Sequence, residues 1–232
     1  MDIILIPGLW LDGSSWDEVT PTFEQAGHRT HALTLPGMES KDADRSQIGR
    51  QDHVDAVVAT IDSVVGSVVL VGHSMGAGIA YAALDARPDR VVHAIYVGGF
   101  PTGDGQGSEF PSVDGEIPLF DWSDFDEEDQ VGLDAEARAR FQERAIPSPA
   151  RVTSDPQRLS DEGRHDVPVT VICTEFSAEM LKGWVDDDLE PVREFQKIRD
   201  VTYVDLPTGH WPQFTKPTEL AEVILEAIDT EH

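Results

Sequence analysis

The stretch VVLVGHSMGAG, residues 68–78, decides the fold of this chain. Its apolar, largely β-branched start predicts a buried strand, and residues 75–86 carry a helical pattern. The turn between them, Gly72-His73-Ser74-Met75-Gly76, matches G-x-S-x-G in the strand–turn–helix context that gives this pattern its meaning. We therefore predict that Ser74 lies at the apex of a sharp turn.

Such a turn explains both glycines. Side chains two positions before and after the apex would collide with the crossing strand and helix, so Gly72 and Gly76 carry none. The turn lifts Ser74 Oγ above the sheet edge, and the backbone N–H of Met75 at the helix start faces any oxyanion that forms there. A glycine-rich connection without function is the alternative, but the flanking strand and helix favour the nucleophile.

Short apolar runs alternate with helical patterns along the rest of the chain, which is typical of βα units that build a mostly parallel sheet. A helix is predicted around residues 54–65, where valines and isoleucine recur at three- and four-residue steps; others are predicted at 16–26, 75–86 and 217–228. The six predicted strands are Ile3–Pro7, Thr30–Leu35, Val68–Gly72, Ala94–Val97, Val169–Cys173 and Thr202–Leu206.

Residues 101–165 break this rhythm. They contain glycines at 103, 105 and 107, an acidic run over Asp121–Asp129, a predicted helix over Asp134–Arg144 and the proline pair Pro147 and Pro149. We predict an insertion that caps the carboxyl ends of the strands, where open α/β sheets bind their ligands. Residues 1–232 are then a single α/β domain with helices on both faces of a six-stranded sheet and a cap at about 101–165.

A serine hydroxyl needs a base within hydrogen-bond reach, and eight histidines compete for that role. His210 lies in Leu206–Pro212, after the last predicted strand and before the last helix, so its loop leaves the same sheet edge as Ser74. His73 adjoins Ser74 but is expected to point elsewhere, and His232 ends the chain. The remaining histidines, at positions 28, 31, 53, 93 and 165, are interpreted as surface or capping residues.

The charge balance excludes several partners. The chain has 44 acidic and 17 basic residues and a formal net charge of −27, which repels phosphates, so neither nucleic acid nor an anionic membrane surface is an expected partner. This composition suits a high-salt source or an acidic bacterial proteome. The single cysteine, Cys173, is expected to be a small buried hydrophobe. The apolar start at residues 3–7 lacks a basic leader and is read as a first strand, which predicts a cytoplasmic protein; the oligomeric state, including a homodimer, stays open.

With these residues in place, the sequence resembles the α/β hydrolases, and within them the small branch of plant methylesterases, hydroxynitrile lyases and uncharacterised bacterial relatives. The resemblance spans residues 6–10 with Trp16, residues 72–76, 173–175 and 208–212. It implies an oxyanion hole formed by the backbone amides of Leu9 and Met75, with Trp10 lining the pocket. This chain has Pro7-Gly8 where many relatives have His-Gly, and Gly8 still lets the backbone turn toward a substrate.

The acid that should orient the histidine departs from the family pattern. Relatives place an aspartate just after the fifth strand, and Phe176 occupies that position here. Glu175 is our choice because it leaves the strand end directly and has the longer side chain. Glu179, which starts the next helix, and Asp104, in the loop after the fourth strand, stay open as alternatives.

The sequence thus predicts a serine esterase that cleaves a small carboxylic ester or lactone through an acyl-enzyme on Ser74, with His210 as general base and no metal or organic cofactor. No metal-ligand spacing is present. Two alternatives remain: a lyase that uses the same residues, as the hydroxynitrile lyase resemblance implies, and a ligand receptor built on a slow hydrolase.

Overall fold

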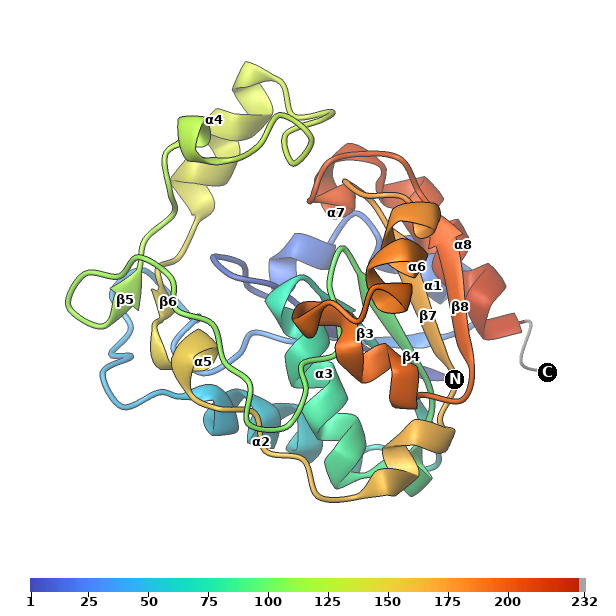
Figure 1. The fold of residues 1–232 in the computed structure, drawn as a ribbon. Helices are drawn as coiled ribbons and strands as arrows, with labels where there is room; N and C mark the ends of the chain where they lie inside the picture. The colour runs from blue at the N-terminus through green and yellow to red at the C-terminus, as the bar shows by residue number, and fades with distance from the viewer. Residues whose placement is uncertain (230–232) are drawn as a thin grey trace.

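A six-stranded parallel sheet forms the centre of the computed structural model, which describes residues 1–229 (Figure 1). The strand order is β2-β1-β3-β4-β7-β8, and every neighbouring pair is parallel, so all six carboxyl ends meet at one edge. The α/β fold expected from the sequence is confirmed. The strands are β1 (Asp2–Ile6), β2 (Arg29–Ala32), β3 (Val68–His73), β4 (Val91–Val97), β7 (Val169–Cys173) and β8 (Val201–Asp205).

The inner strands are almost entirely buried because helices cover both faces of the sheet, and only Val92 of β4 is exposed. Every residue of β1, β3 and β7 is buried, whereas the edge strands β2 and β8 are partly exposed. The second strand ends at Ala32, three residues earlier than predicted. Leu35 is apolar because it packs in the core against α2 (Arg50–Ser63), and not because it pairs in the sheet.

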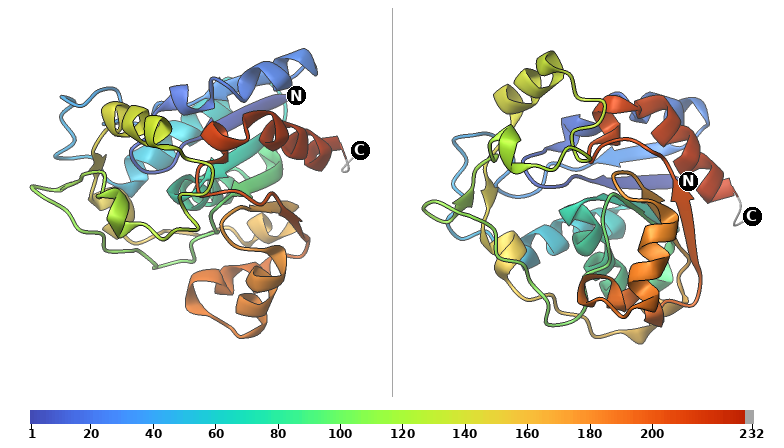
Figure 2. Two further views of the ribbon diagram at one scale, coloured as in Figure 1. Left: turned by 90° about the horizontal axis from the view of Figure 1, so that it is seen from above. Right: turned by 45° about the horizontal axis from the view of Figure 1, so that its top comes forward.

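Two helical layers enclose the sheet (Figure 2). One layer holds α2, α3 (Met75–Ala86), α6 (Ala178–Asp186) and the 3-10 helix η5 (Glu190–Lys197); the other holds the 3-10 helix η1 (Gly13–Trp16), α1 (Thr20–Gln25) and α8 (Pro217–Asp229). The helix predicted at 16–26 was wrong in extent: it is split, because Pro21 fits only the first turn of α1. The predicted valine pattern also ran too far, since α2 ends at Ser63 and Val65 is 97% exposed.

The segment 101–165, which we call the cap segment, contains a small antiparallel pair and short helices (Figure 1). They are β5 (Glu116–Ile117), η3 (Trp122–Asp124), α4 (Ala135–Arg144), β6 (Ser148–Pro149), α5 (Arg151–Ser154) and η4 (Glu162–Asp166). Asp134 begins α4 by accepting a hydrogen bond from Ala137 N at 2.8 Å, as an N-cap residue does. The remaining short elements are η2 (Pro88–Arg90) and α7 (Pro212–Thr215).

The cap segment packs on loops that leave the carboxyl ends of the outer and central strands. Ile146 N–H donates to Trp10 O after β1 at 3.0 Å, and His210 N–H, after β8, donates to Asp129 O at 2.8 Å. A third apolar cluster joins these parts, with Trp10, Ile117, Phe141 and Trp211 all buried. The cap segment therefore contacts loops at the sheet edge where parallel α/β sheets place their ligands.

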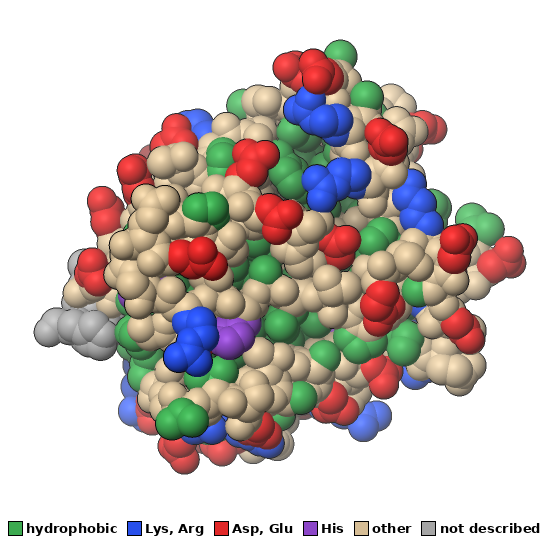
Figure 3. All heavy atoms as spheres, turned by 180° about the vertical axis from the view of Figure 1, so that it is seen from behind, with side chains coloured by type: hydrophobic (Ala, Val, Ile, Leu, Met, Phe, Trp, Pro, Cys, Tyr) green, Lys and Arg blue, Asp and Glu red, His purple; other side chains and the backbone are tan. Residues whose placement is uncertain are grey.

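Carboxylates are spread over the surface, and the back of the molecule shows more of them than of cationic side chains (Figure 3). One ion cluster is buried: Arg164 contacts Asp85 at 3.0 Å and Glu194 at 3.3 Å. Through residue 229, no helix has both the length and the apolar character that a bilayer crossing requires.

Candidate active site

Ser74 lies at the apex of the predicted turn. Strand β3 ends at His73, helix α3 begins at Met75, and Ser74 between them has φ 53° and ψ −123°, a backbone conformation that non-glycine residues seldom adopt. Its own N–H donates to Val97 O at 2.9 Å, and its carbonyl accepts from Ala77 N at 2.9 Å. The neighbouring strand and the first turn of α3 thus hold the serine in a strained position above the sheet.

The two glycines are required by close backbone approaches. A Cβ atom at Gly72 would lie 2.5 Å from Gly76 O, and a Cβ at Gly76 would lie 2.6 Å from the carbonyl oxygens of Ile6 and Pro7. These obstacles are backbone atoms of the sheet and the following turn, so they cannot swing away as a flexible side chain can. The tight passage from β3 to α3 depends on the absence of both side chains.

Ser74, His210 and Glu175 form a continuous chain of hydrogen bonds. His210 Nε2 lies 2.8 Å from Ser74 Oγ, and His210 Nδ1 lies 2.7 Å from Glu175 Oε1. The carboxylate accepts from Nδ1–H, which leaves Nε2 as the acceptor for the serine hydroxyl. The arrangement therefore places a hydroxyl, an imidazole and a carboxylate within direct reach of one another.

The electrostatics favour a charged Glu175 and a basic His210. Burial alone would raise the pKa of Glu175, but its hydrogen bond to His210 and the imidazolium charge lower that pKa below its usual value. Burial alone would lower the pKa of His210, but the hydrogen bond and charge of Glu175, together with the charge of Asp129, raise it above the usual value. The side chain of His210 keeps 20% of its surface exposed, so a substrate can reach it.

His73 holds the loop that carries His210. Its Nε2–H donates to His210 O at 2.7 Å, and the two rings lie 5.1 Å apart. Burial lowers the pKa of His73 to about 3, so the His73 imidazole is uncharged at neutral pH. This role of His73 was not predicted from the sequence. The prediction that the remaining histidines are surface or capping residues was wrong for His53 and His93. Both are buried, with Nε2 of His53 beside Pro36 O and Nε2 of His93 beside Thr170 Oγ1.

Of the three candidate acids, the structure brings only Glu175 to His210 within residues 1–229. Asp104 instead accepts a hydrogen bond from Leu159 N at 2.9 Å, and Glu179 is exposed in the first turn of α6. Phe176, where the family resemblance led us to expect an aspartate, turns into the core, with its ring 5.2 Å from that of Phe100. His232 lies outside the described residues.

The loop after β1 runs directly against Ser74. A Cβ at Gly8 would lie 2.9 Å from Ser74 Cβ, so only glycine allows this approach. Among the described residues, no partner is found for the backbone N–H of Leu9 or of Met75, which leaves both free to donate. Leu9 follows Gly8 and Met75 follows Ser74, so both unpaired N–H groups adjoin the contact between these two residues.

Trp10 follows with φ 67°, a strained conformation held by three contacts. Its N–H donates to Ser148 Oγ at 2.8 Å, its indole Nε1–H donates to Ile117 O at 3.2 Å, and its ring meets Phe120 edge-on at 5.2 Å. Trp10 thus ties the loop beside Ser74 to the cap segment.

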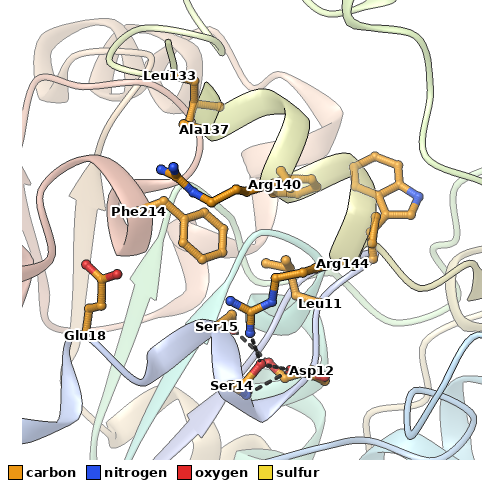
Figure 4. A pocket seen from close by; sticks show the side chains of 13 residues that line it. Leu11, Asp12, Ser14, Ser15, Glu18, Leu133, Ala137, Arg140, Arg144 and Phe214 are labelled. Carbon is orange, nitrogen blue, oxygen red and sulfur yellow. Dashed lines mark hydrogen bonds between the residues drawn. The ribbon is translucent and has the colours of Figure 1, made fainter. Parts of the chain in front are cut away.

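A cavity of about 120 Å³ opens beside Trp10 between η1 and α4 (Figure 4). Its walls include Leu11, Phe141 and Phe214, and Arg140 and Arg144 reach into it from one side of α4. Neither Ser74 nor His210 lines this cavity. Trp10 lines it on one side and packs against the aromatic side chains of the cap segment on another.

Cys173 is buried, as the sequence predicts, and burial raises the pKa of its thiol to about 12.

The sequence pattern of the alpha/beta hydrolase family matches residues 3–223. The chain belongs to this family. A curated relative, a pyrethroid hydrolase from Sphingobium wenxiniae, is 29% identical over 251 residues, covering 98% of this chain and 88% of the relative. Two solved structures share the fold of this alpha/beta hydrolase: a pyrethroid hydrolase from Sphingobium faniae (TM-score 0.71, 23% identity, 99% and 97% of the two chains) and a methylesterase from Arabidopsis (TM-score 0.79, 18% identity, 99% of each).

Proposed function

We propose that this alpha/beta hydrolase cleaves a small carboxylic ester or lactone through an acyl-enzyme on Ser74. The observation that carries the proposal is the chain of contacts from Ser74 Oγ to His210 Nε2 (2.8 Å) and from His210 Nδ1 to Glu175 (2.7 Å). A positioned base and an orienting carboxylate are what a serine hydroxyl needs to become a nucleophile at neutral pH.

The reaction follows from this geometry. His210 Nε2 removes the hydroxyl proton as Ser74 Oγ attacks the ester carbonyl, and the backbone N–H groups of Leu9 and Met75 donate to the oxyanion. Glu175 stabilises the imidazolium. His210 then passes the proton to the leaving alcohol, and the same base activates a water molecule that hydrolyses the acyl-enzyme. Every step uses side chains and amides of this chain and needs no added cofactor.

The cap segment favours an ester with an apolar, ring-bearing part. The aromatic side chains of Phe120, Trp122 and Phe125 are half-buried and pack around Trp10 and Trp211 above the sheet edge. The names of the relatives, a pyrethroid hydrolase and a methylesterase, point to esters as the substrate class. We therefore infer an aryl or alkyl carboxylic ester, recognised mainly by apolar contact.

The first prediction tests the nucleophile. The protein is treated with a fluorophosphonate probe and assayed with p-nitrophenyl acetate, followed by a panel of aryl methyl esters, alkyl esters and lactones. We expect peptide mass spectrometry to find the probe on Ser74, and we expect Ser74→Ala to lose labelling and at least about 10⁴-fold in kcat.

Ser63→Ala, on the exposed side of α2, is the matched control and should keep both signals. Turnover that survives in Ser74→Ala would refute the proposal. Labelling of Ser74 without turnover across the whole panel would contradict ester hydrolysis and favour a receptor, and cyanide release from a cyanohydrin without ester cleavage would favour a lyase.

A further inference from the structure

The acidic run of the cap segment, Asp121–Asp129, is hydrogen-bonded at its last residue to the loop that carries His210. His210 N–H donates to Asp129 O at 2.8 Å, and Gly209 N–H donates to Val131 O at 3.1 Å. A side chain at position 209 would overlap the Asp129 carbonyl, so the two backbones meet at the closest approach that glycine permits. Asp129 is 81 positions before His210 in the sequence, and this contact is made only by folding.

The Asp129 side chain extends toward the same imidazole. One carboxylate oxygen of Asp129, one of Glu175 and one ring nitrogen of His210 all lie within 4.8 Å of one another, and all three residues are partly buried. Both ring nitrogens of His210 are already engaged, by Glu175 and by Ser74, so the ring has no free lone pair for a metal ion. The cluster is better understood as two negative charges beside one histidine.

We propose that Asp129 is a positioning residue whose carbonyl anchors the His210 loop and whose carboxylate, together with Glu175, stabilises the protonated imidazole. Two carboxylates this close repel each other, and the repulsion is relieved when His210 takes the serine proton and places a positive charge beside both. The effect on His210 is independent of the substrate, whereas its benefit to the reaction rests on the proposed function.

The titration of the neighbouring groups agrees with this geometry. Burial raises the pKa of Asp129, the charge of His210 lowers it, and the charges of Glu175 and Asp126 raise it. His73, whose Nε2–H donates to the carbonyl of His210, is neutral, because burial lowers its pKa to about 3. The groups that face His210 are therefore two carboxylates and one neutral imidazole.

The second prediction measures the pKa of His210 by NMR, which requires no turnover. The ring signal is assigned from its absence in His210→Gln. We expect Asp129→Asn to lower the pKa of His210 by about 0.5 to 1 unit, because a nearby negative charge that favours the charged form is removed. Asp129→Glu keeps the charge and should stay near the native value, and Asp129→Ala, a second neutral variant, should match Asn.

Glu128→Gln is the matched control, since it removes a charge from the adjacent, exposed position of the same segment. Its effect should be a small fraction of that of Asp129→Asn and should vanish in about 1 M NaCl, where the Debye length is about 3 Å, whereas the effect of the half-buried Asp129 should persist. Equal shifts in the two variants would overturn the proposal.

Kinetics add a second readout if the enzyme turns over p-nitrophenyl acetate. The acid limb of the kcat/KM profile should move to lower pH by the same amount in Asp129→Asn, and kcat at the plateau should fall roughly 3- to 10-fold with KM nearly unchanged. If Asp129→Asn lowers the pKa of His210 but the native protein turns over no ester, the role of Asp129 stands and the esterase proposal is refuted. If the native protein is an active esterase but Asp129→Asn leaves the pKa of His210 unchanged, the esterase proposal stands and the role of Asp129 is refuted.

Discussion

At the residue scale, the decisive feature is that Glu175 and Phe176, which follow β7, point in different directions. Glu175 turns to His210 and Phe176 turns into the core against Phe100. Gly98 lies beside this glutamate: its φ is 54°, and a Cβ there would lie 2.9 Å from Oγ1 of Thr174, whose hydroxyl donates to Glu175 Oε2. The longer glutamate therefore reaches the imidazole from the residue before Phe176, where the family resemblance led us to expect an aspartate.

The third prediction concerns Glu175 and the pH profile. Since Glu175 and Asp129 raise the pKa of His210, activity of the native protein should fall as pH drops through a value above 6.5, where the base becomes protonated. Glu175→Gln should cost roughly 10²- to 10⁴-fold in kcat, because the imidazolium loses its partner, and should move the acid limb to lower pH.

The measurement is kcat and kcat/KM of each variant from about pH 5 to 9. Glu175→Asp, which keeps the charge with a shorter reach, should lie between the native protein and Glu175→Gln. Glu179→Gln changes an exposed carboxylate four residues away and should match the native profile. A Glu175→Gln variant within twofold of native activity would remove Glu175 from the mechanism.

At the element scale, the site depends on how tightly β3, α3 and the turn after β1 cross one another. The carbonyls of Ile6 and Pro7 lie where a side chain at Gly76 would have to be. The same closeness places Gly8, which precedes Leu9, against Ser74, which precedes Met75. One packing contact thus supports both the nucleophile and the proposed oxyanion donors.

The fourth prediction follows from that crossing. Gly76→Ala should lower the free energy of unfolding by about 1 to 3 kcal/mol and abolish probe labelling of Ser74, because the new methyl group meets backbone and forces β3 and α3 apart. Gly183→Ala, in exposed α6 with nothing near its Cβ position, should instead raise the free energy of unfolding by about 0.5 to 1 kcal/mol. Urea denaturation of the native protein and the two variants measures the free energies of unfolding, and the fluorophosphonate probe measures the labelling of Ser74. Equal stability of Gly76→Ala and the native protein would contradict the steric argument.

At the scale of the whole molecule, the main feature is the large negative net charge and its effect on the stability of the folded state. A net charge of −27 is spread over the surface, and much of it has no cation nearby (Figure 3). Such self-repulsion destabilises the compact state, and added salt screens it. The buried contacts of the proposed site are screened less, so stability and site electrostatics should respond differently to salt.

The fifth prediction is that the Tm rises steadily between about 0.01 and 0.2 M KCl, as the Debye length falls from about 30 Å to below 10 Å. Chloride is chosen because strongly excluded salts such as sulfate stabilise proteins by another route. Differential scanning calorimetry at pH 7.5 is the measurement. A Tm that is flat or falling over this range would show that surface repulsion does not limit stability.

Local patterns alone determined much of this protein. Apolar runs of strand length indicated the six strands, and Gly72, Ser74 and Gly76 between a strand and a helix indicated the turn, because the constraints on such a turn come from residues adjacent in sequence. The position of His210 after the last strand followed from topology, since parallel strands bring their carboxyl ends to one edge.

Only the tertiary structure decided which carboxylate reaches His210, because a chain with 44 acidic residues offers many and their spacing does not distinguish them. The same holds for the contacts that His73 and Asp129 make with the backbone of His210. These contacts join segments far apart in the sequence, and side-chain packing between such segments leaves no periodic signal in either one.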